Sequence, residues 1–495
     1  MVLTYQHQSN TWHSGPWYTP NTTKYLCIHG HFYQPPRENP FIGGIPKENG
    51  AEPFDNFNEK ITAECYRSNA ELGNYEYISF NLGHTLADWL EKSEKNRDVL
   101  QQIIASERRH YERYGVSNAL AQPYNHTILP LATFYDKWTQ ILGGIASYDH
   151  LFKRKPHGMW LSETAVDLVT LDIVAQCGIE YVVLAPWQAK TWPDPAGPYK
   201  VRLYYTRSIN VFFYNADLSG SVSFDDSMTN DAYDFANAHL GREMFTLIAT
   251  DGELYGHHKK DRDKFLYHVV NFAAQQKGVE VITLERYLKL YPPTREIEIW
   301  DNSSWSCKHG VSRWDTGCDC TNFGDPGKNA WKGILRRALN ALALQAYELF
   351  EVEVRDALPE PHKARNEYIC LHNGWMTEGD FWGKYGRNHR KPDDAEIIYK
   401  TMLLLEAQYY MQQAFTSCGW YWESFDNYQA QKNLLFAYRA IHLILQATGV
   451  NFATNSLDDL AAIHQCIPAL HELEPLEFEQ KMNPLLKRGN STHLS

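Results

Sequence analysis

The stretch Phe245-Thr246-Leu247-Ile248-Ala249-Thr250-Asp251 is an apolar run with the pattern of a buried β-strand, and it ends in a carboxylate. Earlier in the chain, Gly158-Met159-Trp160-Leu161-Ser162-Glu163 repeats this arrangement with a second carboxylate. Parallel α/β folds keep their functional residues at the C-terminal ends of their strands. The two stretches therefore predict an α/β fold in which Asp251 and Glu163 face one site.

The regions around these stretches alternate between strand-like and helix-like patterns. Strands are predicted at residues 24–31, 78–82, 159–161, 180–184, 201–214 (a hairpin or two strands), 245–250 and 279–283. Helices are predicted at residues 85–106, 129–152, 166–177, 227–240 and 261–276. Roughly seven such βα repeats favour a closed or nearly closed barrel, with a doubly wound open sheet as the alternative. No glycine-rich nucleotide fingerprint follows a predicted strand, which disfavours Rossmann and P-loop folds.

The second half of the chain has a helical pattern. Apolar residues recur at helical spacing in residues 330–354, 395–415 and 428–448, whereas residues 356–391 are rich in Pro, Gly and charge and are expected to connect helices across the surface. The predicted organisation is an N-terminal arm at 1–23, a catalytic barrel at 24–300, a helical domain at 301–485 that contributes a loop to the active site, and a disordered tail at 486–495.

Composition narrows the function classes. A formal net charge of −12 argues against a general nucleic-acid binder. The N-terminus lacks the pattern of a secretory signal, and no run approaches about 18 consecutive apolar residues, so no membrane span is expected. Nine scattered cysteines suit reduced thiols in a cytoplasmic enzyme. Aromatic residues make up 14% of the chain, which suits both a large core and a platform for sugars.

Two histidines end the first predicted strand, in His29-Gly30-His31-Phe32-Tyr33-Gln34-Pro35. Residues i and i+2 of a strand share a face, so His29 and His31 point the same way. Such a pair can hydrogen-bond a ligand, bind a metal or satisfy a polar core, and ligand binding is the favoured interpretation. A metal would need further ligands, for which Asp251, His257 and His126 are available.

Each carboxylate also has a structural interpretation. Glu163 could be an acidic residue in the first turn of a helix, and Asp251 could be a helix N-cap. Gly252 and the residues that follow it predict a tight active-site loop instead, because glycine lets a main chain approach a ligand closely.

A third candidate region lies between residues 303 and 320. Its four potential zinc ligands do not match the usual zinc spacings, and a loop that lines the cleft is the favoured interpretation. These four residues are Cys307, His309, Cys318 and Cys320.

Taken together, these segments resemble glycoside hydrolase family 57, which carries five short signatures in order. Residues 29–35 are similar to the first signature, the stretch around His126 to the second, residues 158–163 to the third, residues 251–258 to the fourth and residues 305–310 to the fifth. The chain departs from the family pattern at Ser162, where proline is usual, and at His258, where an aromatic residue is frequent. Residues 416–423 resemble the helical domain of a poorly characterised branch of the family.

The resemblance implies a distorted, TIM-like (β/α)7 barrel followed by helices, and a retaining enzyme that acts on α-1,4-glucans such as amylose, glycogen and maltooligosaccharides. Glu163 would be the nucleophile and Asp251 the general acid/base, with no metal or organic cofactor. A raised pKa of Asp251 would be needed, with Glu253 and Glu163 as its causes. The expected substrate-binding residues are His29, His31, Gln34, His126, Trp160, Glu253, His258, Trp305 and His309.

The acceptor of the glycosyl group stays open at this level. Water would make the chain an α-amylase, and a second glucan would make it a 4-α-glucanotransferase or a branching enzyme. One alternative is a metal-dependent polysaccharide hydrolase, deacetylase-like or α-mannosidase-like, with His29, His31 and Asp251 as ligands. The other is a non-catalytic glucan-binding protein.

Overall fold

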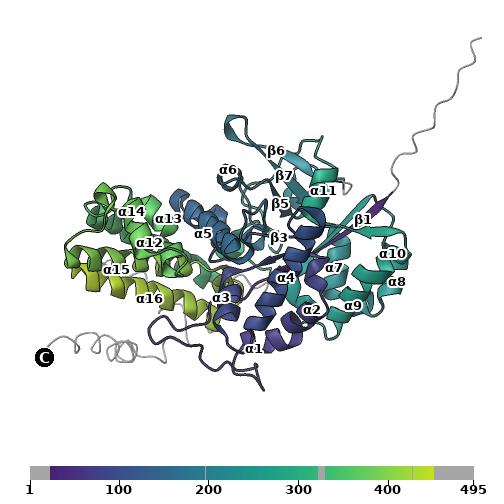
Figure 1. The fold of residues 1–495 in the computed structure, drawn as a ribbon, viewed down its shortest axis with the longest axis horizontal. Coiled ribbons are helices and arrows are strands. Elements are labelled where there is room, and N and C mark those ends of the chain that lie inside the picture. The colour runs from purple at the N-terminus through teal and green to yellow at the C-terminus, as the bar shows by residue number, and fades with distance from the viewer. Residues whose placement is uncertain (1–22, 195–196, 321–328, 426, 451–495) are drawn as a thin grey trace, which may run out of the picture.

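The computed structural model describes residues 23–194, 197–320, 329–425 and 427–450, and its C-terminal helices lie beside an α/β part (Figure 1). Seven parallel strands of the α/β part are linked into a ring. The strands are β1 (Lys24–Phe32), β2 (Ser79–Leu82), β3 (Ala119–Leu120), β4 (Gly158–Met159), β5 (Tyr181–Leu184), β7 (Ser208–Phe213) and β8 (Phe245–Asp251). β1 pairs with β2 and β8, β2 with β3, β4 with β5, and β5 with β7. A bridge from Ala121 to Met159 joins β3 to β4. The backbone N–H of Asn215 donates to Leu247 of β8 at 2.8 Å and closes the ring after β7.

The predicted (β/α)7 barrel is therefore confirmed, and the open sheet is not observed. Two further strands lie outside the ring: β6 (Tyr199–Arg202) is antiparallel to β7, and β9 (Val279–Val281) pairs with the start of β1. The β5 residues Tyr-Val-Val-Leu are all buried, as expected for a strand covered on both faces.

Helices cover the outside of the ring. They include α3 (His84–Lys92), α4 (Arg97–Tyr114), α5 (Phe134–Phe152), α6 (Leu168–Gln176), α7 (Ala216–Phe224), α8 (Ala232–His239), α9 (Arg262–His268), α10 (Ala274–Gln276) and α11 (Leu284–Leu290). The single helix predicted at 85–106 is wrong, because extended backbone at Ser93 separates α3 from α4. The sequence prediction also missed β3 and α7, and the short helices α1 (Phe57–Ile61) and α2 (Arg67–Glu71).

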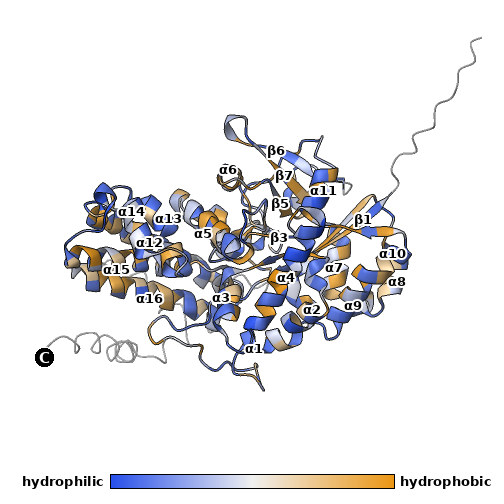
Figure 2. Ribbon diagram, viewed as in Figure 1, coloured by the Kyte–Doolittle hydropathy of each residue, from blue (hydrophilic) through white to orange (hydrophobic). Residues whose placement is uncertain are grey.

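The C-terminal half is helical, with its own apolar core. α12 (Ala330–Val354), α15 (Ala395–Gln413) and α16 (Tyr428–Thr448) agree with the predicted helices, and hydrophobic and hydrophilic bands alternate along α15 and α16 (Figure 2). The prediction of a surface connection at 356–391 is wrong, since this stretch contains α13 (Pro361–His372) and α14 (Glu378–Tyr385). Pro361 begins α13, and the Thr377 hydroxyl caps α14, so helix-start signals were present in the sequence.

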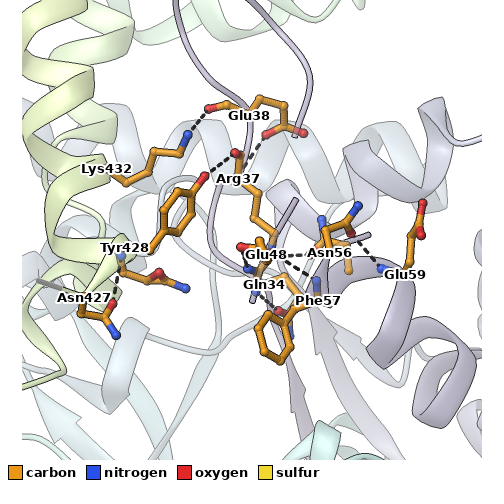
Figure 3. Close-up of polar contacts among 12 residues, drawn as sticks. Gln34, Arg37, Glu38, Glu48, Asn56, Phe57, Glu59, Asn427, Tyr428 and Lys432 are labelled. Atoms are coloured by element: carbon orange, nitrogen blue, oxygen red, sulfur yellow. Dashed lines mark hydrogen bonds and ion pairs between the residues drawn. The ribbon is translucent and has the colours of Figure 1, made fainter. Parts of the chain in front are cut away.

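The helical half packs against the barrel along α5. The Arg365 guanidinium of α13 pairs with the Asp136 carboxylate of α5 at 2.9 Å, and the Gln140 amide donates to Gln412 of α15 at 3.0 Å. A second contact joins α16 to the segment after β1, where the Tyr428 hydroxyl donates to the Arg37 carbonyl and the Lys432 ammonium to the Glu38 carbonyl, each at 2.8 Å (Figure 3).

Two predicted regions, the arm at 1–23 except Thr23 and the tail at 486–495, lie outside the described residues. None of the described helices is long and apolar enough to cross a membrane.

Candidate active site

Asp251 is the last residue of β8 and lies in register with His31 of β1. Its side chain reaches solvent, and the protein groups around it still desolvate the carboxyl. Desolvation, then the charges of Glu253 and Glu163, raise the pKa of Asp251 to about 8. Its side chain makes no helix-capping hydrogen bond, so the N-cap interpretation does not apply. Asp251 is therefore a carboxyl group that keeps its proton at neutral pH.

Glu163 lies in a short turn after β4 with a left-handed backbone, φ 57°. α6 begins only at Leu168 and is capped by Asp167, so Glu163 is not a first-turn residue of that helix. Its Oε2 accepts hydrogen bonds from the Trp305 indole N–H at 2.8 Å and from the Ser306 hydroxyl at 2.7 Å. Oε1 accepts none from the described residues. Two donors on one oxygen thus orient the carboxylate and leave the other oxygen available.

Glu253 is a neighbouring carboxyl group whose negative charge raises the pKa of Asp251. Its Oε1 accepts hydrogen bonds from the Tyr66 hydroxyl at 2.5 Å, the Tyr33 backbone N–H at 3.2 Å and the Gln34 amide at 3.4 Å. Burial raises the pKa of Glu253 to about 7 against the opposing effect of these donors. The carboxyl is thus a fixed, partly ionised neighbour of Asp251 rather than an exposed sugar ligand.

Gln34 is held at both ends of its amide. Its nitrogen donates to Tyr66 at 3.0 Å, and its oxygen accepts from the Arg37 guanidinium at 2.8 Å (Figure 3). Arg37 in turn pairs with Glu48 at 2.5 Å. Through Gln34 and Arg37, these contacts connect the Glu253 carboxylate to the segment after β1 that α16 contacts.

The three histidines expected to bind sugar form a buried network instead of an open surface. His29 and His31 both contact Asn81 Oδ1 at 3.2 Å, while the second ring nitrogen of His29 contacts Ser79 and that of His31 contacts His126. The remaining nitrogen of His126 lies 2.6 Å from the Ser417 hydroxyl. Burial lowers the pKa of His29 to about 3 and of His31 to about 4, so both imidazoles are neutral.

Trp160 lies against this network and is fully buried. Its ring stacks on His29 at 4.6 Å and on His31 at 5.4 Å between centroids, and it meets Trp305 edge-on at 5.1 Å. Trp160 and the histidines thus form the support on which Trp305, the partner of Glu163, rests.

The two remaining residues predicted to bind substrate, His258 and His309, lie on separate loops. His258 is exposed on the loop after Glu253. His309 is exposed too, and its ring contacts Cys320 and Asp319 rather than Glu163 or Asp251.

Two glycines shape the loop after Asp251. Gly256 has a left-handed φ of 135°, which only glycine adopts readily. Gly252 is needed for space, because an added Cβ would lie 2.4 Å from the Phe32 ring.

Sequence reasoning missed several site residues. The Tyr421 ring, 39% exposed, is within electrostatic range of both Glu163 and Asp251. The Arg313 guanidinium lies 4.9 Å from that ring, is within range of Glu163 and donates to the Ser306 carbonyl at 2.5 Å. Tyr421 comes from the helical half, and its place beside residues of the barrel depends on tertiary packing that no local pattern encodes.

Metal ligation by His29, His31 and Asp251 gains no support from this arrangement. Among the described residues, one group of His, Cys, Asp and Glu side chains converges closely enough to hold a metal, and it contains none of these three.

Comparison with known proteins agrees with the barrel fold. The model of glycosyl hydrolase family 57 matches residues 7–300, and that of a domain of unknown function (DUF3536) matches residues 328–473. No curated protein sequence matches the chain.

Similar solved structures support the same fold. They include a maltose-forming amylase from Pyrococcus sp. ST04, with 15% identity, TM-score 0.70, and 89% of this chain and 82% of that chain covered. A branching enzyme from Pyrococcus horikoshii has 14% identity, TM-score 0.58, and coverage of 90% and 94%. A 4-α-glucanotransferase from Thermococcus litoralis has 14% identity, TM-score 0.53, and coverage of 86% and 59%. The family model matches residues 7–300, which is more than half of the chain. The chain therefore belongs to glycosyl hydrolase family 57.

Proposed function

We propose that the chain is a retaining glycosidase or transglycosylase of α-1,4-glucans, with Glu163 as nucleophile and Asp251 as general acid/base. The observation that carries this proposal is the contrast between the two carboxyl groups. The pKa of Asp251 is raised to about 8, whereas Glu163 has two hydrogen-bond donors on one oxygen and, among the described residues, none on the other. Such a division of roles is what a double-displacement mechanism needs.

In the first step, Glu163 Oε1 attacks the anomeric carbon while the Asp251 proton moves to the glycosidic oxygen. The bond between the anomeric carbon and that oxygen breaks, the shortened glucan leaves as an alcohol, and the sugar is held as an ester of Glu163. Trp305 and Ser306 hold Oε2 throughout, so the carboxylate need not reorganise as its charge is consumed.

In the second step, Asp251, now ionised, takes the proton of an acceptor hydroxyl while the acceptor oxygen displaces Glu163. Water as acceptor gives hydrolysis, a sugar 4-hydroxyl gives glucanotransfer and a 6-hydroxyl gives a branch. The α-glucan substrate is inferred from the family and from the named activities of the structural relatives, an amylase, a branching enzyme and a glucanotransferase.

We assign direct sugar contact to the partly exposed Trp305 and Tyr421. His258, exposed on the loop after Glu253, stays a predicted substrate-binding residue. The buried residues His29, His31, His126, Trp160, Gln34 and Glu253 are positioning residues in this proposal, because protein partners occupy their polar atoms or protein buries their rings.

Product analysis after incubation with maltooligosaccharides and amylose tests the proposal. New reducing ends indicate hydrolysis, longer oligomers indicate transfer and 1,6-linkages indicate branching. Unchanged substrate at high enzyme concentration, with the Glu163→Gln variant binding the oligosaccharide as tightly as wild type, would support the non-catalytic alternative instead.

The pH dependence of kcat/KM follows from the pKa of Asp251. This group must be protonated when the glycosidic bond breaks, so kcat/KM should be retained below about pH 8 and fall as pH rises through that value. Glu253→Gln removes a negative charge that raises this pKa, so the basic limb should move to lower pH. Glu64→Gln, on an exposed carboxylate that pairs with His257, is the control and should leave the limb in place.

Removal of one hydrogen-bond donor tests whether the loop that contains Trp305 and Ser306 orients the Glu163 carboxylate. Ser306→Ala should lower kcat by about tenfold to a hundredfold, the worth of a hydrogen bond to a charged group, with a smaller effect on KM. Ser303→Ala is the matched control, because the Ser303 hydroxyl donates to the Trp300 carbonyl and does not contact Glu163. Equal effects of the two variants would contradict the orienting role.

A further inference from the structure

The loop that holds Glu163 continues into a cluster of four potential metal ligands. Cys307 directly follows Ser306, and its sulfur lies with those of Cys318 and Cys320 and a ring nitrogen of His309 within 4.8 Å of one another. The cluster is separate from the two carboxylates, and nothing in the proposed mechanism uses it.

The spacing of the ligand atoms fits tetrahedral zinc. Zn–S bonds of about 2.3 Å place two sulfurs ~3.8 Å apart, and a Zn–N bond of about 2.1 Å places nitrogen ~3.6 Å from sulfur. Cys307 Sγ lies 3.7 Å from both Cys318 Sγ and Cys320 Sγ, and Cys320 Sγ lies 3.4 Å from His309 Nδ1. A disulfide needs sulfurs only about 2.05 Å apart, and it would leave the third thiol unpaired.

The surroundings of the four side chains also fit a metal site. The second ring nitrogen of His309 lies 3.4 Å from the Asp319 carboxylate, the arrangement that fixes the orientation of a ligating imidazole. Backbone N–H groups of His309 and Arg313 donate to Cys307, and that of Lys308 donates to Cys320. These bonds would satisfy sulfurs that carry negative charge.

Charge balance gives an independent observation. Three thiolates, one neutral imidazole and one Zn²⁺ sum to a single negative charge. The Lys332 ammonium is fully buried, has no hydrogen-bond partner among the described residues and lies within electrostatic range of Cys318 and Cys307. A buried cation without a hydrogen-bond partner is costly, and an anionic zinc–thiolate centre would add to the countercharge of Glu423, which is also within electrostatic range of Lys332.

We propose that Cys307, His309, Cys318 and Cys320 bind one zinc ion in a closed, structural site. Four protein ligands leave no open position for water or substrate, so the ion takes no part in the reaction. Its role is to fix the loop of residues 305–320, and thereby the Trp305 and Ser306 donors on Glu163. The inference goes beyond the proposed activity and does not depend on it.

Metal analysis of the full-length, reduced protein tests this site. About one zinc per chain is expected after purification, and Co²⁺ in its place should give the visible absorption of tetrahedral, thiolate-bound cobalt. Cys318→Ser and Cys320→Ser should lower the zinc content at least about tenfold. His309→Cys should retain it, because four ligands remain. Cys177→Ser, at a half-buried thiol outside the cluster, is the control and should also retain it.

Three results would overturn the site. One is less than about a tenth of a zinc per chain, both as purified and after incubation of the reduced wild-type protein with zinc. Another is stoichiometric iron in place of zinc. The third is a disulfide between two cluster cysteines in native protein that binds no zinc after reduction. All three are read on wild-type protein, so a variant that fails to fold does not obscure them, and none depends on glycosidase activity.

Discussion

Glu163→Gln should lower kcat on maltooligosaccharides at least about a thousandfold, because the amide cannot form the glycosyl ester on which both steps depend. The substitution is isosteric, and the amide oxygen can still accept from Trp305 and Ser306. Substrate binding should therefore persist while turnover is lost. Initial rates from released reducing ends, together with calorimetric binding of the oligosaccharide, measure both quantities.

Glu180→Gln is the matched control for this substitution. Glu180 is exposed directly before β5, outside the site, and the same chemical change there should alter kcat less than twofold, in line with surface substitutions. A loss of less than about tenfold in Glu163→Gln would show that another group is the nucleophile.

Asp251→Asn should lower kcat/KM on a natural glucan by about 10²–10⁴-fold, the usual worth of general acid catalysis. The loss should depend on the leaving group. α-Maltosyl fluoride releases fluoride without a proton from the enzyme, so its first step should be affected far less than that of a glucan. Comparison of the two substrates in the same variant measures this dependence, and equal losses on both would contradict the role of Asp251 as acid.

The stability of Asp251→Asn provides a check on its folding. The pKa of Asp251 rises from 3.8 to about 8 in the folded state, so the folded protein binds the proton more tightly than the unfolded chain does. The carboxyl therefore destabilises the fold progressively as pH rises between these values, and fully above about 8. Thermal unfolding of the Asp251→Asn variant at pH 9 should give a Tm at least as high as that of wild type at the same pH. A lower Tm there would mean that the lost activity reflects a damaged fold.

The barrel could be predicted from the sequence where strands are long and apolar. β1, β5 and β8 are such runs, and their order with intervening helices carries the fold. β3 has two residues and takes its conformation from pairing with β2 and from the bridge at Ala121, which are tertiary contacts without a local pattern. The break between α3 and α4 falls at Ser93, whose carbonyl accepts from the backbone N–H groups of Asn96 and Arg97, and this local turn was not separated from the helical pattern around it.

The two carboxylates were identifiable because each follows an apolar strand, but their partners were not. Glu163 depends on Ser306, and its neighbour Tyr421 is far away in the sequence. The His-x-His motif was visible, whereas the burial of His29 depends on Ser79, Asn81 and Trp160 from other strands. The ligands of the proposed zinc site do not match the usual zinc spacings, because two pairs at i and i+2, Cys307 with His309 and Cys318 with Cys320, converge only when the loop folds back on itself.

Trapping of the glycosyl-enzyme tests the central claim most directly. Wild-type protein is incubated with 5-fluoro-α-D-glucosyl fluoride, whose ring fluorine slows release of the sugar more than its attachment, and the labelled peptide is identified by mass spectrometry. We expect one fluoroglucosyl ester, on Glu163, and no label in Glu163→Gln. A label on a different residue, or products of inverted anomeric configuration from a natural glucan, would contradict the account.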